Sequence, residues 1–455
     1  MKIDVKYLRK AMLIAIPIMI QNGITNFVSM LDNIMIGQIG TEQMSAVAII
    51  NQLMFVFNLC IFGGLSGIGI FTAQYAGKKD NDGIRYTFRL SLMLGILLTV
   101  VGTLVFLTHG NSLIQLYLHA DASITDTSNT LAYALDYLQC MLWGIIAFAI
   151  TQAYASVLRS CGESIAPMVS GIIAVLVNLI GNYILIFGKM GMPAMGVKGA
   201  AIATVLSRYV ELGYLVLHTH YHPTTHPYVS TVYTSLHIPK GLLKQCIIKG
   251  SPLLLNEALW SSGQAVLSQN YSLRGLSVVA GLNIAQTINN VFNIGFIAMG
   301  SAIGIVIGQE IGTGRLCTVK KHANELAFFT VILCTGIGSL LFLSSGIFPG
   351  IYRTSQDIRD IATDIIRISA LFMPVYAYCN ASYFTIRSGG KTMITFIFDC
   401  GYTWLLSIPT AYFLINYTTL PFLTVFISVQ ILELIKGIIS FFLIQKGFWI
   451  VNLTQ

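Results

Sequence analysis

One carboxylic acid of this sequence lies where a charge is costly. Asp32 follows twenty residues without a charged side chain, in the stretch NFVSMLDNIMIGQIG (residues 26–40). An unpaired carboxylate in an apolar environment costs several kcal/mol, so acids inside apolar membrane segments usually mark ion or proton pathways. We therefore interpret Asp32 as a proton-binding acid. The alternative is a structural role, in which it hydrogen-bonds a neighbouring helix.

A second acid, Glu257, lies in the apolar stretch SPLLLNEALWSSG (residues 251–263). The same reasoning makes it a candidate coupling or cation-binding residue. The alternative is a neutral glutamic acid that holds helices together through hydrogen bonds.

The remaining charges in apolar segments look structural. Arg208 and Glu211 are three residues apart, and so are Glu433 and Lys436. This spacing places each pair on one helix face and predicts local ion pairs. Asp399 is expected to bind Lys391 or backbone amides.

The stretch HTHYHPTTH (residues 218–226) carries four histidines and raises the question of a metal site. It lacks the paired ligand spacing of zinc motifs and contains proline, which favours a solvated linker. Eight cysteines without a C-x-x-C motif are interpreted as small apolar residues rather than disulfides or metal ligands. No metal site and no cofactor are expected.

These residues must be positioned by membrane helices. The 455 residues are 55% hydrophobic and 10% charged, with a mean hydropathy of +0.74, whereas soluble domains carry about 25% charged residues. Windows long enough to cross about 30 Å of hydrocarbon predict twelve spans, near residues 11–36, 46–72, 88–108, 131–155, 165–187, 196–217, 246–270, 279–308, 324–345, 363–386, 393–415 and 419–443.

Charge predicts the orientation of these spans. With the N-terminus inside, the inner gaps hold 18 Lys and Arg residues and the outer gaps hold five. Basic residues accumulate on the cytoplasmic side, so both termini should be cytoplasmic in a multi-pass protein of the plasma (inner) membrane. The net charge of +8 is scattered over these short gaps and does not indicate nucleic-acid binding.

An internal repeat divides the chain. A shift of 235 residues superimposes, without a gap, Pro17 on Pro252, Phe57-Asn58 on Phe292-Asn293, Gln74 on Gln309 and Gly77 on Gly312. The predicted fold class is all-α: twelve transmembrane helices in two six-helix lobes, related by a pseudo-two-fold axis along the membrane normal. The predicted domains are an amino-terminal lobe (1–217), a cytoplasmic linker (218–244) and a carboxy-terminal lobe (245–455).

Several stretches together resemble one transporter family. LDNIMIGQIG, GGLSGIGIFTAQYAGKKD, LRSCGESIAPM, VNLIGNYILIFG and MGVKGAAIATVLSR are similar, in this order, to the multidrug and toxic compound extrusion (MATE) family. The resemblance covers nearly the whole chain. It implies export of organic, often cationic compounds, driven by inward flow of protons or sodium ions.

The resemblance also implies roles for particular residues. The first-helix acid of the family falls on Asp32 and its kinking proline on Pro17, and the amino-lobe polar cluster falls on Asn178, Asn182 and Thr204. Many relatives have an acid where this sequence has Asn182. With one carboxylate left, a site of hard anionic oxygens is weakened, so protons are favoured over sodium at this lobe.

Aromatic and methionine residues recur where the two lobes should face each other. We expect a substrate cleft for flat, amphipathic cations, bound by stacking and cation–π contact, and lined by Trp260, Phe292, Met299 and Tyr376.

The function predicted is a secondary antiporter working by alternating access. Its partners would be small organic substrates and the lipid bilayer, and the protein is expected to be a monomer. The alternative transporter is a lipid-linked oligosaccharide flippase of related architecture, which would need a more basic cleft. The phosphate loop G-x-x-x-x-G-K-[ST] of ATP-driven pumps and the enzyme motifs H-E-x-x-H and G-x-S-x-G are absent from the sequence, so no enzyme is expected.

Overall fold

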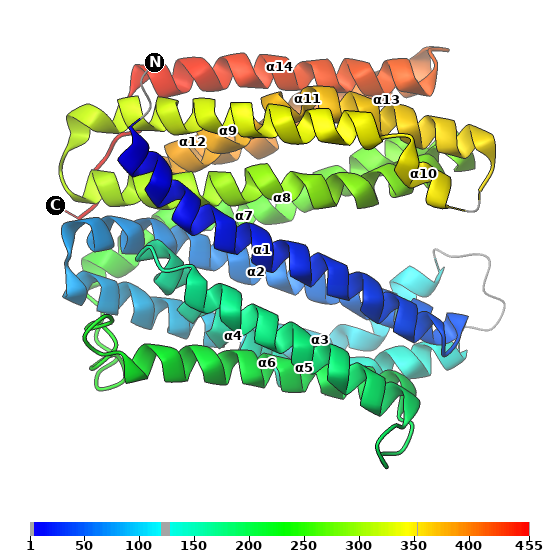
Figure 1. The fold of residues 1–455 in the computed structure, drawn as a ribbon, viewed down its shortest axis with the longest axis horizontal. Coiled ribbons are helices and arrows are strands. Elements are labelled where there is room, and N and C mark those ends of the chain that lie inside the picture. The colour runs from blue at the N-terminus through cyan, green and yellow to red at the C-terminus, as the bar shows by residue number, and fades with distance from the viewer. Residues whose placement is uncertain (1–3, 120–127, 353, 455) are drawn as a thin grey trace. The chain divides into compact units, whose positions relative to one another are not determined.

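The computed structural model describes residues 4–119, 128–352 and 354–454, and in these ranges the chain is helical without a β-strand (Figure 1). Lys2 and Arg353, two of the basic residues counted above, lie outside the described residues. In chain order the helices are α1 (Val5–Gly37), α2 (Thr41–Lys78), α3 (Asn81–His119), α4 (Ser128–Ser160), α5 (Ile165–Phe187), α6 (Gly196–Tyr221), α7 (Lys240–Ser272), α8 (Leu276–Gly312), α9 (Leu316–Ser344), α10 (Ile347–Ile351), α11 (Gln356–Ser388), α12 (Thr392–Phe396), α13 (Ile408–Tyr417) and α14 (Phe422–Lys446).

Each of the twelve predicted spans falls, to within a few residues, on one of the long helices. The eleventh is a continuous helix, in which two π-helical turns, η1 (Ile397–Gly401) and η2 (Thr403–Ser407), join α12 to α13. Among the described residues, ten helices are long and apolar enough to cross a membrane. The two remaining segments are this interrupted helix and the more polar α7. The all-helical fold is confirmed, and the chain is a multi-pass membrane protein.

Proline interrupts helices at equivalent places in the repeat. Pro17 lies inside α1 and Pro252 inside α7, and Pro374 lies inside α11. Proline cannot donate the backbone hydrogen bond of its position, so each of these helices has a weak point where it can bend. α1 therefore carries its predicted kinking residue well before Asp32.

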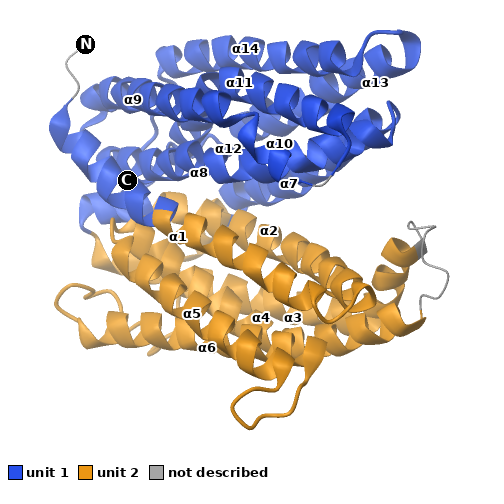
Figure 2. Cartoon of the chain, turned by 45° about the vertical axis from the view of Figure 1, so that its right-hand side comes forward, with its two compact units in different colours: residues 1–19, 73–79, 247–455 blue, residues 20–72, 80–246 orange. Residues whose placement is uncertain are grey.

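The chain divides into two compact units that do not follow the order of the sequence (Figure 2). Unit 1 comprises Met1–Met19, Ala73–Lys79 and Ile247–Gln455, and unit 2 comprises Ile20–Thr72 and Asp80–Cys246. α1 thus changes from unit 1 to unit 2 two residues after Pro17. The helix that carries Asp32 belongs to both units, and the proline lies next to the point of division.

The core of unit 1 explains why the first part of α1 belongs to it. Ala11, Ile14 and Ile18 of α1 are buried in one apolar cluster with residues of α8 and α9, such as Val306 and Ala323. In a membrane, close packing of such side chains stabilises helix contacts through van der Waals attraction. The start of α1 is therefore fixed by packing inside unit 1.

A reciprocal backbone contact joins residues that the repeat relates. A Cβ atom at Gly77 would lie 1.9 Å from the carbonyl oxygen of Gln309, and one at Gly312 would lie 1.9 Å from that of Gln74. All four residues belong to unit 1. Only glycine permits so close an approach of two backbones. The end of α2 and the end of α8 therefore pack against each other through the same contact made twice.

The segment between α6 and α7 packs on the rest of unit 2. Tyr228 is 3% exposed and Val232 is 2% exposed. The guanidinium group of Arg89 on α3 donates to the carbonyl oxygens of Val232 (2.8 Å), Thr231 (2.6 Å) and His237 (3.2 Å). The histidine-rich stretch expected to be solvated is exposed over residues 220–225, whereas the segment that follows it is fixed because a buried arginine binds its backbone.

Candidate functional site

The predicted amino-lobe residues meet around Asp32 in unit 2. Asn178 and Asn182 are four residues apart on α5 and so project from the same face. The Nδ2 atom of Asn182 donates to Asp32 Oδ1 at 2.8 Å, and the Nδ2 atom of Asn178 lies 3.1 Å from Thr204 Oγ1 on α6. Asn182 is 1% exposed and Asn178 is also buried. The structure thus brings these four side chains into one hydrogen-bonded cluster.

The amide of Asn178 can face this cluster with either end, and both of its polar atoms find partners beside an ionised Asp32 when its nitrogen is toward that carboxylate. With its oxygen toward Asp32, that oxygen accepts from Asn182 Nδ2 at 3.3 Å, and the Thr204 hydroxyl donates to the Ala200 carbonyl at 3.0 Å. With its nitrogen toward Asp32, it donates to Asp32 Oδ2 at 2.9 Å and accepts from the Thr204 hydroxyl at 3.1 Å.

The two orientations suit different protonation states of Asp32. The first brings two oxygens together, which is favourable when Asp32 carries a proton and donates it, or when a bound cation lies between the oxygens. The second offers an N–H group to an ionised carboxylate, which makes a stronger, charge-assisted bond. The cluster can therefore satisfy Asp32 in both states by rotating one amide and one hydroxyl.

Close packing of α5 on α6 makes these contacts possible. A Cβ atom at Gly181 would lie 2.9 Å from Cβ of Ala203, and one at Gly199 would lie 2.6 Å from the Leu185 carbonyl oxygen. Both glycines let the two helices approach to a distance that larger residues would prevent. As a result, the asparagines of α5 reach the hydroxyl of Thr204 directly.

A small pocket of about 50 Å³ opens beside this cluster, within unit 2. It shares Thr204 with the cluster. Most of its lining is aromatic or aliphatic, and it consists of Met54, Phe57, Asn58, Met141, Gly144, Ile145, Phe148, Thr204, Val205 and Arg208. Its apolar lining with a few polar groups is the character of a ligand pocket, although the volume is smaller than the several hundred Å³ that a drug-sized molecule fills. Sequence reasoning missed Met141 and Phe148, because apolar residues surround them in the sequence and nothing distinguishes them from packing residues.

The charge of Arg208 in this pocket is compensated. Its guanidinium group lies 3.1 Å from Glu211 Oε2, as the three-residue spacing predicted. It also lies over the ring of Phe148, at 5.1 Å from the ring centroid. The polar side of the pocket is therefore close to neutral.

The carboxy-terminal acids form a second polar group, in unit 1. Asp399 binds the ammonium group of Lys436 at 3.0 Å and accepts from Asn256 Nδ2 at 3.2 Å. The expectation that Asp399 binds Lys391 is wrong, because Lys436 is buried beside it and needs a counter-charge. Lys436 also lies 3.9 Å from Glu433, as predicted.

Glu257 follows Asn256 on α7 and lies at the edge of this group. In the described part of the chain it forms no hydrogen bond or ion pair, but Arg387 and Asp399 act on it electrostatically. The guanidinium of buried Arg387 lies 5.2 Å from the centroid of the Phe384 ring, and its Nη1 atom has no hydrogen-bond partner among the described residues. Glu257 is therefore a carboxylate of this group whose charge is not directly paired in the described structure.

The four residues expected to bind substrate lie in different surroundings, all in unit 1. Trp260 is 38% exposed on α7. Phe292 packs edge-on against Phe348, and the hydroxyl of Tyr376 donates to Gln430. Met299 is completely buried in the apolar cluster of α8 and α9. Of the four, Trp260 is the one that offers a substantial free surface.

Comparison with known proteins identifies the family and the fold of this chain. The MatE family model matches residues 17–184 and 252–413. The "Probable multidrug resistance protein NorM" of Thermotoga maritima is 23% identical, over 98% of this chain and 94% of its own. The "Multidrug resistance protein MdtK" of Pectobacterium atrosepticum is 24% identical, over 89% of this chain and 87% of its own.

Solved structures share the fold. One titled as the outward-facing conformation of a multidrug resistance MATE family transporter aligns with a TM-score of 0.84 and 19% identity, over 98% of both chains. A MATE in the bent conformation aligns with a TM-score of 0.86 and 20% identity, over 97% of this chain and 95% of its own. One in the straight conformation gives a TM-score of 0.84, also at 20% identity, over 96% of this chain and 95% of its own.

Proposed function

Because this chain belongs to the MatE family, the multidrug and toxic compound extrusion transporters, we propose that it is a secondary antiporter that exports amphipathic organic cations in exchange for protons. Its named relatives are multidrug resistance proteins. The observation that carries the proposal is the cluster of Asp32, Asn178, Asn182 and Thr204 beside an apolar pocket.

Protons suit the amino-lobe cluster better than sodium. The oxygens of Asp32 are approached by the amide nitrogens of Asn182 and, in one orientation, Asn178. A sodium ion would need these positions filled by oxygens instead. A proton needs one carboxylate and a neighbour that can accept from it, and Asn178 Oδ1 is such an acceptor.

Proton binding would act on the pocket through Thr204. Protonation of Asp32 favours the orientation in which the Thr204 hydroxyl turns to Ala200, and ionisation favours the one in which it turns to Asn178. Loss of the negative charge also weakens the attraction for a cation in the pocket. Uptake of a proton therefore promotes substrate release, and the return to the ionised state restores binding.

α1 would transmit this change. It carries Asp32 in unit 2 and packs in unit 1 before Pro17. Bending near Pro17 therefore changes the direction of the part that carries Asp32 while the first part keeps its packing. We propose that α1 alternates between bent and straight forms, with access alternating between the two membrane sides. Both termini are proposed to be cytoplasmic, in the plasma membrane, and the working unit a monomer.

The apolar pocket supports export of organic cations over the flippase alternative. Among its lining residues Arg208 is the one basic side chain, and Glu211 neutralises it. Aromatic rings and the polarisable sulfur of methionine bind flat cations of varied shape. The pocket therefore favours amphipathic cations over phosphate-linked sugars.

The test is gradient-driven transport in proteoliposomes. Wild-type protein should export a fluorescent organic cation under an imposed proton gradient and not under a sodium gradient alone. Asp32→Asn, which mimics the protonated state, should abolish transport while the protein stays folded. The control is Asp136→Asn, which removes a half-exposed carboxylate paired with Lys198 at 3.2 Å in the same unit.

Two outcomes would contradict the proposal. If Asp32→Asn still concentrates substrate, Asp32 is not the coupling acid. If a sodium gradient alone drives wild-type export, the assignment of protons is wrong.

A further inference from the structure

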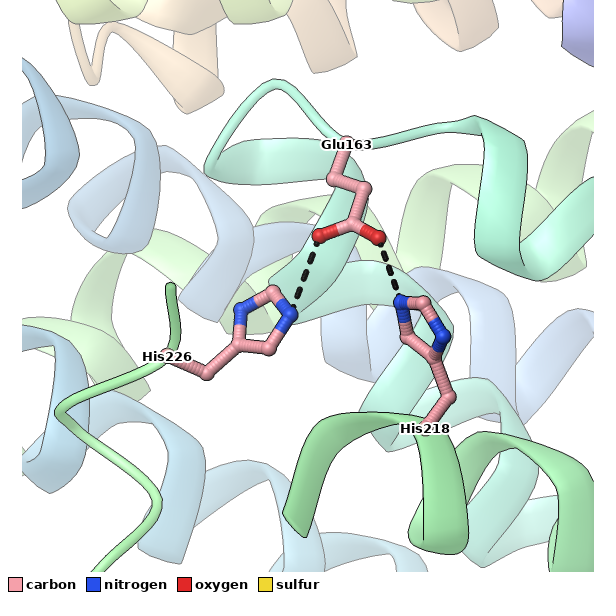
Figure 3. A group of neighbouring side chains, drawn as sticks. All are labelled: Glu163, His218 and His226. Carbon is pink, nitrogen blue, oxygen red and sulfur yellow. Dashed lines mark hydrogen bonds and ion pairs between the residues drawn. The ribbon is translucent and has the colours of Figure 1, made fainter. Parts of the chain in front are cut away.

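A carboxylate and two imidazoles face one another at one end of unit 2, away from Asp32 (Figure 3). Glu163 lies in the loop between α4 and α5, His218 in the last turn of α6, and His226 in the segment between α6 and α7. His218 Nε2 lies 2.8 Å from Glu163 Oε1, and His226 Nε2 lies 3.2 Å from Glu163 Oε2. One atom from each of the three residues lies within 4.8 Å of the other two.

His226 is poorly satisfied by the protein alone. Its side chain is 3% exposed, and its Nε2 atom forms no hydrogen bond of acceptable geometry with any described residue, in spite of the nearby carboxylate. A buried ring nitrogen without a hydrogen bond is destabilising. The nitrogen is directed toward the space between Glu163 and His218, which is where a ligand would relieve this cost.

A tyrosine can hold the ring of His226 in the tautomer that a metal requires. The other ring nitrogen, Nδ1, lies 3.3 Å from the hydroxyl of Tyr228. When Nδ1–H donates to that oxygen, the lone pair of Nε2 is left free and the ring is held in place, as in established metal sites.

We propose that Glu163, His218 and His226 bind one divalent transition-metal ion of the zinc type. Two neutral imidazoles and one carboxylate are a ligand set that zinc uses, with an open fourth position for water. Around a tetrahedral zinc ion, ligand atoms lie about 3.3 Å apart. The His226–Glu163 pair is already at this separation (3.2 Å), the His218–Glu163 pair is closer (2.8 Å, to the other carboxylate oxygen), and the three ligand atoms lie within 4.8 Å of one another.

His222 lies next to His218, one of the proposed ligands. Its ring centroid lies 4.9 Å from that of His218, one helical turn earlier. The Nδ1 atom of His222 lies 2.8 Å from the His218 carbonyl oxygen, and when Nδ1 is the donor, Nε2 is free. The site therefore uses the histidine-rich stretch for which solvent exposure alone was expected.

Metal binding would fasten three segments together. The loop after α4, the end of α6 and the start of the α6–α7 segment each supply one ligand. The same segment is held further along by Arg89. A bound ion would add a second fixed point and protect the segment from local opening.

Zinc binding can be measured directly on the full-length protein, purified without a polyhistidine tag and treated with a chelator. Calorimetric titration with Zn²⁺ should show one saturable equivalent, and Mg²⁺ should show none. His218→Ala, His226→Ala and Glu163→Gln should each weaken binding by about tenfold or more. The matched control is His237→Ala, which removes an exposed histidine of the same segment.

Two further measurements make the result decisive. Co²⁺ in the same site should give the visible absorption of tetrahedral coordination, and this should disappear in His226→Ala. Zn²⁺ should also slow proteolysis of the α6–α7 segment, reversibly with chelator.

Absence of saturable zinc binding by the wild type would overturn the proposal. Binding that survives both His218→Ala and His226→Ala would overturn it equally, because other histidines would then be responsible. Neither result depends on transport, so these experiments test the metal site independently of the proposed export function.

Discussion

Replacement of Arg89 by methionine should release the α6–α7 segment from unit 2. Methionine keeps much of the aliphatic length but removes three hydrogen bonds, to the carbonyl oxygens of Thr231, Val232 and His237. Hydrogen bonds to charged groups contribute about 1.5–3 kcal/mol each. Thr231 and His237 are exposed, so water can replace the arginine there, and most of the loss comes from buried Val232.

The expected loss is therefore about 3 kcal/mol rather than the sum of three full bonds. Since about 1.4 kcal/mol corresponds to a factor of ten, the open form of the segment should become about a hundredfold more populated. The measurement is limited digestion of the detergent-solubilised protein by chymotrypsin. Cleavage after Tyr228 requires opening, because this side chain is buried, and its rate should follow the open population.

Arg85→Met is the matched control, one helical turn earlier on α3. The hydrogen bond from Arg85 to the Tyr228 carbonyl is long, at 3.4 Å, and the ion pair of Arg85 is with the exposed Asp82. Such surface pairs contribute about 0–1 kcal/mol, so cleavage should accelerate by less than about tenfold. If Arg89→Met is cleaved at the wild-type rate, or if both variants behave alike, Arg89 does not hold the segment as described.

Three other perturbations test different parts of the molecule. Glu257→Gln should impair transport or substrate binding in a folded protein, and normal transport at every pH tested would show that the residue is structural. Burial raises the pKa of the Cys161 thiol to about 12, so near neutral pH this cysteine lacks the reactive thiolate. Maleimide added from the cytoplasmic side should therefore label the exposed Cys317 and leave Cys161 unlabelled. Labelling of Cys317 from outside would contradict the proposed orientation. Gly312→Ala should lower the melting temperature strongly because its Cβ would meet backbone at 1.9 Å, at a cost of about 1–3 kcal/mol or more, whereas Gly336→Ala has open space around it and should be neutral.

The helices were predictable because a long apolar run that crosses a membrane has few possible backbone conformations. Every backbone polar group must be satisfied internally there, so a run such as residues 165–187 becomes a helix over its full length, as α5 does. The pairing of Arg208 with Glu211 was predictable for a similar reason, since helix geometry fixes neighbours three residues apart.

Contacts between distant segments could not be predicted in this way. Asp399 and Lys436 lie on different helices, and no local spacing joins them. The burial of Tyr228 depends on the packing of Phe88 and on Arg89, which lie about 140 residues earlier. The cluster around Asp32 was anticipated through family resemblance, whereas the two orientations of Asn178 became visible only with the coordinates.

The reciprocal contact of Gly77 with Gln309 and of Gly312 with Gln74 has an evolutionary consequence. A contact in which residue i meets j and the copy of j meets the copy of i is the signature of a two-fold homodimer. Before duplication joined the halves, one glycine and one glutamine in a half-length ancestor would have made both contacts, so a single mutation would have damaged the interface twice. After fusion into one chain, the residues of each contact are encoded separately, so the two contacts can change independently of each other.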